Sequence, residues 1–288
     1  MDQTNPLIAL KQCGEKLGTN TFTGEDYGKF RHVEAHAIRP YLIPIANGGF
    51  ISYNPQDDKI ILQERLFTFL KAKFGTTDYD VIGIHSERPG GSNNAVLNLL
   101  NYDLRIYGVS QISLSDSQNV SIFPSRKQIV LKKNRDFSFG GMMTAGKFTF
   151  FGKDYYFNYD KFKVDINGAD SLLFTVRRFT PDGFGNYPEV RVKSVIEQIQ
   201  GDLQIDRVDN KSGRKGIARY PIFTSAKESF VYYDKRAVQR GVYRRDKFYF
   251  KLDPYNLDSL DNFSTRGLKL TGQLTSAGIF PDFKDTLS

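Results

Sequence analysis

Tyr155-Tyr156-Phe157-Asn158-Tyr159-Asp160-Lys161-Phe162-Lys163-Val164-Asp165 is the stretch that decides the fold. It is dense in Phe and Tyr, which both favour the pleated, half-buried surface of a sheet. The same order of residue types returns without a gap from Phe248 to Asp258. We therefore predict strands here, and an internal repeat near residues 148–172 and 241–265.

A shorter pattern, in which a glycine stands at the centre of an apolar-x-Gly-x-apolar segment, also recurs. A strand with a central glycine is one whose backbone bends or is closely approached by another chain segment. Repetition of the pattern predicts successive strands of one long sheet. The three segments are Phe139-Gly140-Gly141-Met142-Met143, Ile199-Gln200-Gly201-Asp202-Leu203 and Leu270-Thr271-Gly272-Gln273-Leu274.

The first 79 residues have a different rhythm, in which apolar residues follow the helical period. Helices are predicted over residues 6–17, 25–38 (ending before Pro40) and 63–74, with a short strand near residue 51. From Asp80 the period becomes two, in Val81 to Ser86 and then in short strands between residues 104 and 131.

These patterns predict an α+β protein that is predominantly β. Residues 1–79 form a small helical N-terminal part, and residues 80–288 form an extended, mainly antiparallel sheet built of repeated strands. The last ten residues resemble the beginning of a further strand, and we expect a C-terminally truncated segment of a longer chain.

Charge and cysteine content limit the classes of partner. The formal charge of +8 arises from 40 basic and 32 acidic residues, but the basic residues are scattered instead of forming one stripe, so nucleic acid is not a favoured partner. The lone Cys13 excludes an internal disulfide. We find no signal-peptide pattern and predict no transmembrane segment.

Three sets of residues are candidates for binding. The first is the pair of aromatic blocks, whose residues could line an apolar or glycan site or could pack in the core. The second is a trio of histidines; two lie close together in sequence, as metal-ligand pairs often do, although capping or surface roles explain them too. The third is a basic loop after a strand, predicted to be exposed and able to contact a polyanion. The sets are Tyr155, Phe157, Tyr159, Phe248 and Phe250; His32, His36 and His85; and Lys211, Arg214 and Lys215.

Catalytic patterns are weak. No Gly-x-Ser-x-Gly motif occurs, and the histidine spacing is not the His-Glu-x-x-His of zinc proteases. Pairs such as Asp154 with Asp160, or Asp258 with Asp261, could serve a glycosidase only at the right separation in space. Asn167-Gly168 favours a hairpin turn over a calcium loop. We predict no cofactor, and a non-enzymatic protein is favoured over a metal-dependent hydrolase or a polyanion-binding module.

Several phrases carry a resemblance: Lys132-Lys133-Asn134-Arg135-Asp136-Phe137, Asn210-Lys211-Ser212-Gly213-Arg214-Lys215, Asp258-Ser259-Leu260-Asp261-Asn262-Phe263 and Ala277-Gly278-Ile279-Phe280-Pro281. With the aromatic blocks, they resemble an internal segment of very large, uncharacterised proteins of outer-membrane bacteria. The Gly-centred strands resemble, more distantly, those of AsmA/TamB-like envelope proteins.

This resemblance implies a scaffold or ligand-binding segment of a large cell-envelope protein, with the rest of the parent chain, lipid or glycan as partners. It implies an envelope or periplasmic location, while composition leaves the cytoplasm open. No functional residue is carried over from it.

Overall fold

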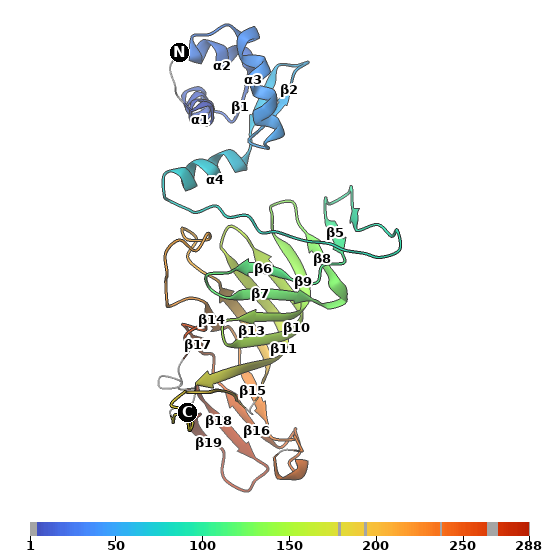
Figure 1. Ribbon diagram of the computed structural model, residues 1–288, viewed down its shortest axis with the longest axis vertical. Coiled ribbons are helices and arrows are strands. Elements are labelled where there is room, and N and C mark those ends of the chain that lie inside the picture. Colours follow the sequence, from blue (N-terminus) through green and yellow to red (C-terminus); the bar gives the residue numbers. More distant parts are fainter. Residues whose placement is uncertain (1–4, 178–179, 193–194, 237, 264–269, 288) are drawn as a thin grey trace. The chain divides into compact units, whose positions relative to one another are not determined.

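The computed structural model describes residues 5–177, 180–192, 195–236, 238–263 and 270–287. The chain forms two compact units, Met1–Tyr79 and Asp80–Ser288 (Figure 1). Small helices dominate the first unit and one large antiparallel sheet dominates the second, as the α+β prediction requires. Among the described residues, no helix is both long and apolar enough to cross a bilayer.

The N-terminal unit packs four helices with a three-stranded antiparallel sheet of order β1-β3-β2. Its core contains Leu10, Cys13, Leu42, Ile60 and Leu66, all fully buried. The elements are α1 (Pro6–Leu17), β1 (Thr21–Thr23), α2 (Gly24–Arg31), α3 (Ala35–Asn47), β2 (Ile51–Asn54), β3 (Lys59–Leu62) and α4 (Glu64–Lys73).

One helix boundary differs from the prediction. The expected helix over residues 25–38 is two helices, because α2 ends at His32 in the left-handed conformation and α3 starts at Ala35. Pro40 and Pro44 lie inside α3. Both prolines are exposed and one turn apart, so the carbonyl groups that they leave without an intrahelical partner face solvent.

Cys13 provides a probe of this unit. Its side chain is fully buried, and burial raises the pKa of the thiol to about 11, so the reactive thiolate is scarce near neutral pH. We expect iodoacetamide to leave Cys13 unmodified in the native protein and to label it only as urea unfolds the N-terminal unit. Mass spectrometry of the alkylated protein gives the readout, and rapid labelling in native buffer would show that the thiol is accessible.

In the second unit, sixteen of the described strands form one sheet. Its main path runs in the order β19-β18-β16-β15-β13-β11-β10-β9-β8-β5-β4. The strands are β4 (Ala95–Leu97), β5 (Leu104–Tyr107), β6 (Ile112–Ser115), β7 (Val120–Pro124), β8 (Gln128–Leu131), β9 (Phe137–Ala145), β10 (Phe148–Asn158), β11 (Lys163–Arg177), β12 (Glu189–Arg191), β13 (Ile196–Gln204), β14 (Ile222–Ser225), β15 (Ser229–Tyr232), β16 (Phe248–Leu252), β17 (Asn256–Leu257), β18 (Leu270–Ser276) and β19 (Phe283–Leu287).

The sheet divides on both sides of its long central strands. One part of β9 pairs with β8 and the rest with β7, while β13 divides its pairing between β15 and β14. The two branches then meet: the Lys147 N–H, in the β9–β10 turn, donates to the Leu260 carbonyl at 3.0 Å, and Gln118 Nε2 donates to Asp206 Oδ2 at 2.8 Å. The sheet therefore curls around a single core.

That core is built from phenylalanine. Phe137 packs on Phe157 with ring centroids 4.8 Å apart, and Phe150 packs on Phe223 at 5.2 Å. Phe148 joins the centre of the sheet to the segment after β17, because its ring lies 4.8 Å from that of Phe263. Inward residues alternate with outward ones along a strand, so every second residue along much of β9 and β10 faces this core.

The two copies of the predicted repeat have different pairing. β10 and β11 pair with each other across the Asp160-Lys161 turn, whereas β16 pairs with β15 and β18, and β17 pairs with β14. Pro254 takes the place of Lys161 in the second copy, and its fixed φ and missing N–H favour an extended continuation over a tight hairpin. Residues 264 and 265, in the predicted second copy, lie outside the described residues.

Three local predictions can be compared with the strands. The Gly-centred segments lie within β9, β13 and β18, and the added Cβ of an alanine at Gly140 would stand 2.6 Å from the Lys153 carbonyl oxygen, which confirms the close approach. Val81 to Ser86 is not a strand. Asn167-Gly168 does not form a hairpin turn, because β11 continues through it between β10 and β13 with an irregular register.

Candidate ligand groove on the sheet face

A line of β-bulges crosses the central strands and shapes the outer face of the sheet. Between the pairs Pro124 with Gly141 and Val130 with Ser138, the chain leaves β9 through the Ser125–Lys127 turn that joins β7 to β8. The register also slips between β9 and β10, between β10 and β11, and between β11 and β13. We call this feature the bulge line. Bulges redirect side chains and often adjoin functional sites.

The bulge line carries backbone conformations that most residues avoid. Arg126 and Lys127 have φ values of 54° and 51°, and Gly141 has 132°. A Cβ at residue 141 would overlap the Phe123 carbonyl oxygen, so only glycine fits there. A long side chain in the left-handed region costs about 1–2 kcal/mol. Arg126 is therefore held in a strained backbone conformation, which sets the direction of its Cα–Cβ bond.

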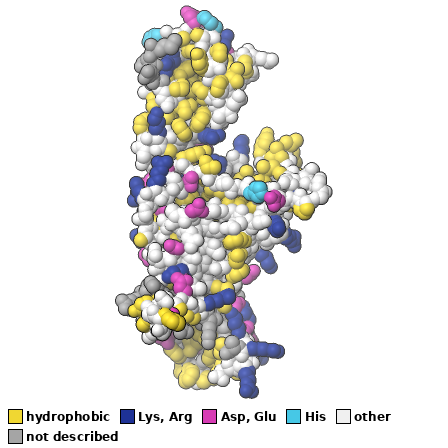
Figure 2. Space-filling view, in the orientation of Figure 1, with side chains coloured by type: hydrophobic (Ala, Val, Ile, Leu, Met, Phe, Trp, Pro, Cys, Tyr) yellow, Lys and Arg dark blue, Asp and Glu magenta, His cyan; other side chains and the backbone are white. Residues whose placement is uncertain are grey.

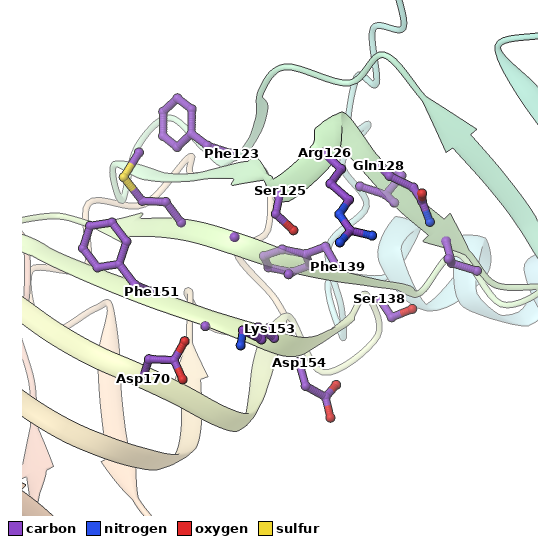
Figure 3. Close-up of a pocket in the computed structure, with 16 residues that line it drawn as sticks. Phe123, Ser125, Arg126, Gln128, Ser138, Phe139, Phe151, Lys153, Asp154 and Asp170 are labelled. Atoms are coloured by element: carbon purple, nitrogen blue, oxygen red, sulfur yellow. The ribbon is translucent and has the colours of Figure 1, made fainter.

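A groove of about 850 Å³ follows the bulge line, between the Ser125–Lys127 turn (η1) and the outer face of β9 and β10 (Figure 3). Its apolar end is a row across three strands, because Met142 pairs with both Phe123 and Phe151. All three side chains are partly exposed on the outer face. Gly140, Gly141 and Gly152 also belong to the lining and contribute no side chains to it.

Charged side chains line the rest of the groove and reach its apolar end, because Asp170 precedes Ser171, the partner of Phe151. Arg126 and Lys153 contribute cations, Asp154 and Asp170 contribute carboxylates, and all four side chains are exposed (Figure 3). None of the four forms an ion pair with another described residue. Ser125, Gln128 and Ser138 add hydroxyl and amide groups. Donors and acceptors of both charges thus face one open groove beside two aromatic rings.

Tyr155 supports the floor from beneath. Its side chain is fully buried on the core face, and a Cβ at residue 152 would lie 2.7 Å from its hydroxyl oxygen, so glycine is required above it. Burial, with a smaller contribution from Asp170, raises the pKa of this phenol well above its usual value. The hydroxyl therefore stays protonated at neutral pH.

The aromatic candidates from the sequence lie elsewhere. Tyr155, Phe157, Tyr159 and Phe250 are buried in the core, because they occupy the inward positions of their strands or turn. Phe248 is partly exposed and stacks on Tyr243 with centroids 4.3 Å apart. The expected aromatic surface is thus mostly core, and the groove uses the outward residues Phe123 and Phe151. Alternation along a strand separates its two faces, but the sequence alone does not show which of them contacts a ligand.

The basic loop is also placed differently from expectation. Lys211 is buried: its Nζ donates to the Val208 carbonyl at 2.9 Å and lies 5.6 Å from the centre of the Tyr159 ring. Asn210 closes the loop, because its side chain bonds both the N–H and the carbonyl of Lys215. Arg214 and Lys215 are exposed, with the Lys215 ammonium 3.8 Å from Asp209. Lys211 therefore stabilises the loop from within, and only Arg214 and Lys215 of the three expected cations are exposed.

The histidines occupy separate elements. His32 ends α2, His36 lies in the first turn of α3, and both are exposed. His85 belongs to the second unit, where its side chain is 83% exposed and its Nε2 lies 3.0 Å from Glu87 Oε1. No cluster of three or more His, Cys, Asp or Glu side chains suited to a metal ion occurs among the described residues.

The carboxylates of the proposed acidic pairs have different surroundings. Asp154 lies in the groove, whereas Asp160 lies in the β10–β11 turn and pairs with Arg135 at 2.9 Å. Asp258 faces Arg219 at 3.6 Å, and Asp261 accepts a hydrogen bond from Asn119 at 3.4 Å. Asp170, the second carboxylate of the groove, follows Asn167-Gly168 in the irregular segment of β11. Sequence reasoning interpreted that segment as a turn and so missed it.

A second aromatic cluster lies on the outer face of β15 and β16. Tyr232 and Tyr249 face each other across the two strands with centroids 6.2 Å apart, and the Arg245 guanidinium stacks 3.6 Å from the centre of the Tyr232 ring. Arg245 is paired with Glu197 and Asp234. The guanidinium of Arg245 thus has partners within the protein, unlike the charged groups of the groove among the described residues, and the cluster has a structural role.

Comparison of the chain with family models, curated proteins and solved structures gives no match.

Proposed function

We propose that residues 80–288 form a non-enzymatic binding segment of a larger cell-envelope protein, and that the groove binds a hydroxyl-rich ligand of the glycan class. The observation that carries the glycan proposal is the Phe123–Met142–Phe151 row beside four charged side chains without ion-pair partners among the described residues. The resemblance described above supports the envelope location and the parent chain.

A sugar matches both the apolar and the charged side chains of the groove. The C–H face of a pyranose ring packs on an aromatic ring, and its hydroxyls donate to carboxylates and accept from Arg and Lys. Asp154 and Asp170 would repel a polyanion, which disfavours nucleic acid. The groove is open and half polar, which disfavours a lipid tail, since apolar chains need an enclosed apolar site. Its described lining contains neither histidine nor cysteine, and so offers no general base or nucleophile of those types.

The test is a binding survey with the full chain and short neutral oligosaccharides of glucose and N-acetylglucosamine, with oligogalacturonate as the acidic comparison. We expect isothermal titration calorimetry to detect a neutral oligosaccharide, and the Phe151→Ala variant to bind it about tenfold more weakly because a stacking platform is lost. Lys215→Ala, on the distant basic loop, serves as the control. Preference for the acidic oligomer, or equal loss in both variants, would contradict the groove assignment.

The strained pair at the bulge gives a sharper test. Replacing either Arg126 or Lys127 with glycine relieves a left-handed conformation, so neither variant should lose stability and each should gain up to about 1 kcal/mol. Only Arg126 lines the groove. We expect Arg126→Gly to weaken oligosaccharide binding about tenfold, as loss of a charged hydrogen bond does, and Lys127→Gly to leave it unchanged. Thermal melts and calorimetry measure both effects, and equal binding losses in the two variants would refute a direct role of the Arg126 guanidinium.

A further inference from the structure

The hairpin of β4 and β5 exposes an apolar tip that the groove does not explain. Leu99 and Leu100 are 74% and 94% exposed, and Val96, Leu97 and Tyr102 are exposed as well. Figure 2 shows hydrophobic side chains gathered where this hairpin projects from the second unit. A contiguous exposed patch of large apolar side chains marks an interaction surface.

Several polar groups of the tip are bonded to one another. The side-chain oxygen of Asn98 accepts from the Leu100 N–H at 2.9 Å, and that of Asn101 accepts from the Asp103 N–H at 3.1 Å. The backbone adds bonds from the Tyr102 N–H to Asn98 and from the Asn98 N–H to Asp103, at 2.8 and 2.9 Å. The backbone N–H groups of Asn98, Leu100, Tyr102 and Asp103 therefore have partners within the turn, as a segment needs before it can enter an apolar phase.

Cations surround this tip. The Lys133 ammonium lies 5.5 Å from the centre of the Tyr102 ring, and Arg105 is exposed on β5. Lys132 pairs with Asp103 at 2.7 Å and neutralises that carboxylate. The hairpin thus presents leucines at its end, a tyrosine behind them and positive charge at the base. This order suits the acyl boundary, the interface and the anionic headgroups of a lipid bilayer.

We propose that the β4–β5 tip inserts into the interfacial region of an anionic membrane. A protein partner is the other occupant for an apolar patch, and a pocket lined in part by Val96, Asn101 and Arg105 lies beside the hairpin. The most exposed apolar side chains, Leu99 and Leu100, do not line that pocket, and their order with Tyr102 and the cations favours a lipid surface. The proposal is independent of the glycan groove, because it rests on different residues and a different ligand chemistry. It describes peripheral attachment through a loop, without any spanning helix.

The test uses the full chain and vesicles of phosphatidylcholine with or without phosphatidylglycerol. We expect co-sedimentation with the anionic vesicles only, and a loss of at least about tenfold in the Leu99→Ser/Leu100→Ser variant. Lys133→Glu should weaken the same binding. Phe184→Ser, which removes a side chain 92% exposed on another loop, is the matched control and should bind as the native chain does.

A fluorescent side chain at the tip reports directly whether the tip enters the membrane. The chain has no tryptophan, so Leu100→Trp introduces a single indole at the tip. Its emission should shift to shorter wavelength with anionic vesicles and stay unchanged with neutral ones. An unshifted emission together with absent sedimentation would overturn the proposal. Concentration-dependent self-association that the double serine variant abolishes, without vesicle binding, would identify a second copy as the occupant and also overturn it.

Discussion

Replacing Asp136 with alanine is expected to lower the free energy of unfolding by about 3–5 kcal/mol, the loss typical of breaking a buried charged network. Asp136 is buried and accepts hydrogen bonds from the Tyr156 hydroxyl at 2.9 Å, the Asn134 amide at 2.9 Å and the Tyr159 N–H at 2.8 Å. It joins the turn before β9 to the end of β10. Its removal leaves the buried Tyr159 N–H and the partly buried Tyr156 hydroxyl without this acceptor, and an unsatisfied buried donor costs about 1–3 kcal/mol.

Asp160 is the matched control for this substitution. It lies in the neighbouring β10–β11 turn and pairs with Arg135 at 2.9 Å, but its side chain is largely exposed. Exposed ion pairs contribute about 0–1 kcal/mol. Urea unfolding followed by circular dichroism should therefore separate Asp136→Ala widely from Asp160→Ala. Similar midpoints for the two variants would show that the Asp136 network does not hold the turns together.

Gly201→Ala is expected to destabilise the sheet by at least about 2–3 kcal/mol, the range for overpacking of a tight interior. A Cβ at residue 201 would overlap the backbone carbonyl oxygen of Thr224 on β14, the strand paired with this part of β13. A backbone atom in a paired strand cannot rotate away as a side chain can. The clash would separate β14 from β13, where the branch of the sheet that contains β14 and β17 begins.

Gly168→Ala tests whether space, and not the loss of a glycine as such, is responsible. Gly168 lies in the adjacent strand β11, has no left-handed φ, and an added Cβ meets no atom within 4 Å. We expect this variant to keep native stability or to gain about 0.4–1 kcal/mol from a less flexible unfolded chain. Hydrogen exchange of the β13 and β14 amides should report loss of protection for Gly201→Ala alone. Equal protection in both variants would refute the close-packing account.

The sequence predicts the elements of this fold better than its connections. The density of Phe and Tyr around Phe157 predicts strands, and the Gly-centred patterns predict places of close backbone approach, because both depend on local chemistry. Strand pairing depends on distant partners. The similar blocks beginning at Tyr155 and Phe248 accordingly pair in different ways, and the local difference with a direct effect on the backbone is Pro254 in place of Lys161.

The candidate site was harder to predict for a related reason. The groove results from register slips that several strands share, and a register slip is a property of pairs of strands. Asn167-Gly168 has the composition of a hairpin turn, but the two neighbours of β11 hold it in the sheet as a bulge. Lys211 has the composition of an exposed cation, yet the loop turns its ammonium inward. Exposure and burial of such residues follow from tertiary contacts that local sequence does not encode.

The most direct test of the glycan groove uses the methionine methyl groups. The chain has three methionines, Met1, Met142 and Met143. Met142 lies between Phe123 and Phe151 on the outer face, whereas its neighbour Met143 is fully buried on the inner face. Methyl NMR of ¹³C-methionine-labelled protein, titrated with the oligosaccharide that binds best, should show a saturable shift of the Met142 resonance while Met143 and Met1 stay in place. A Met142 resonance that does not move at saturation would contradict binding in this groove.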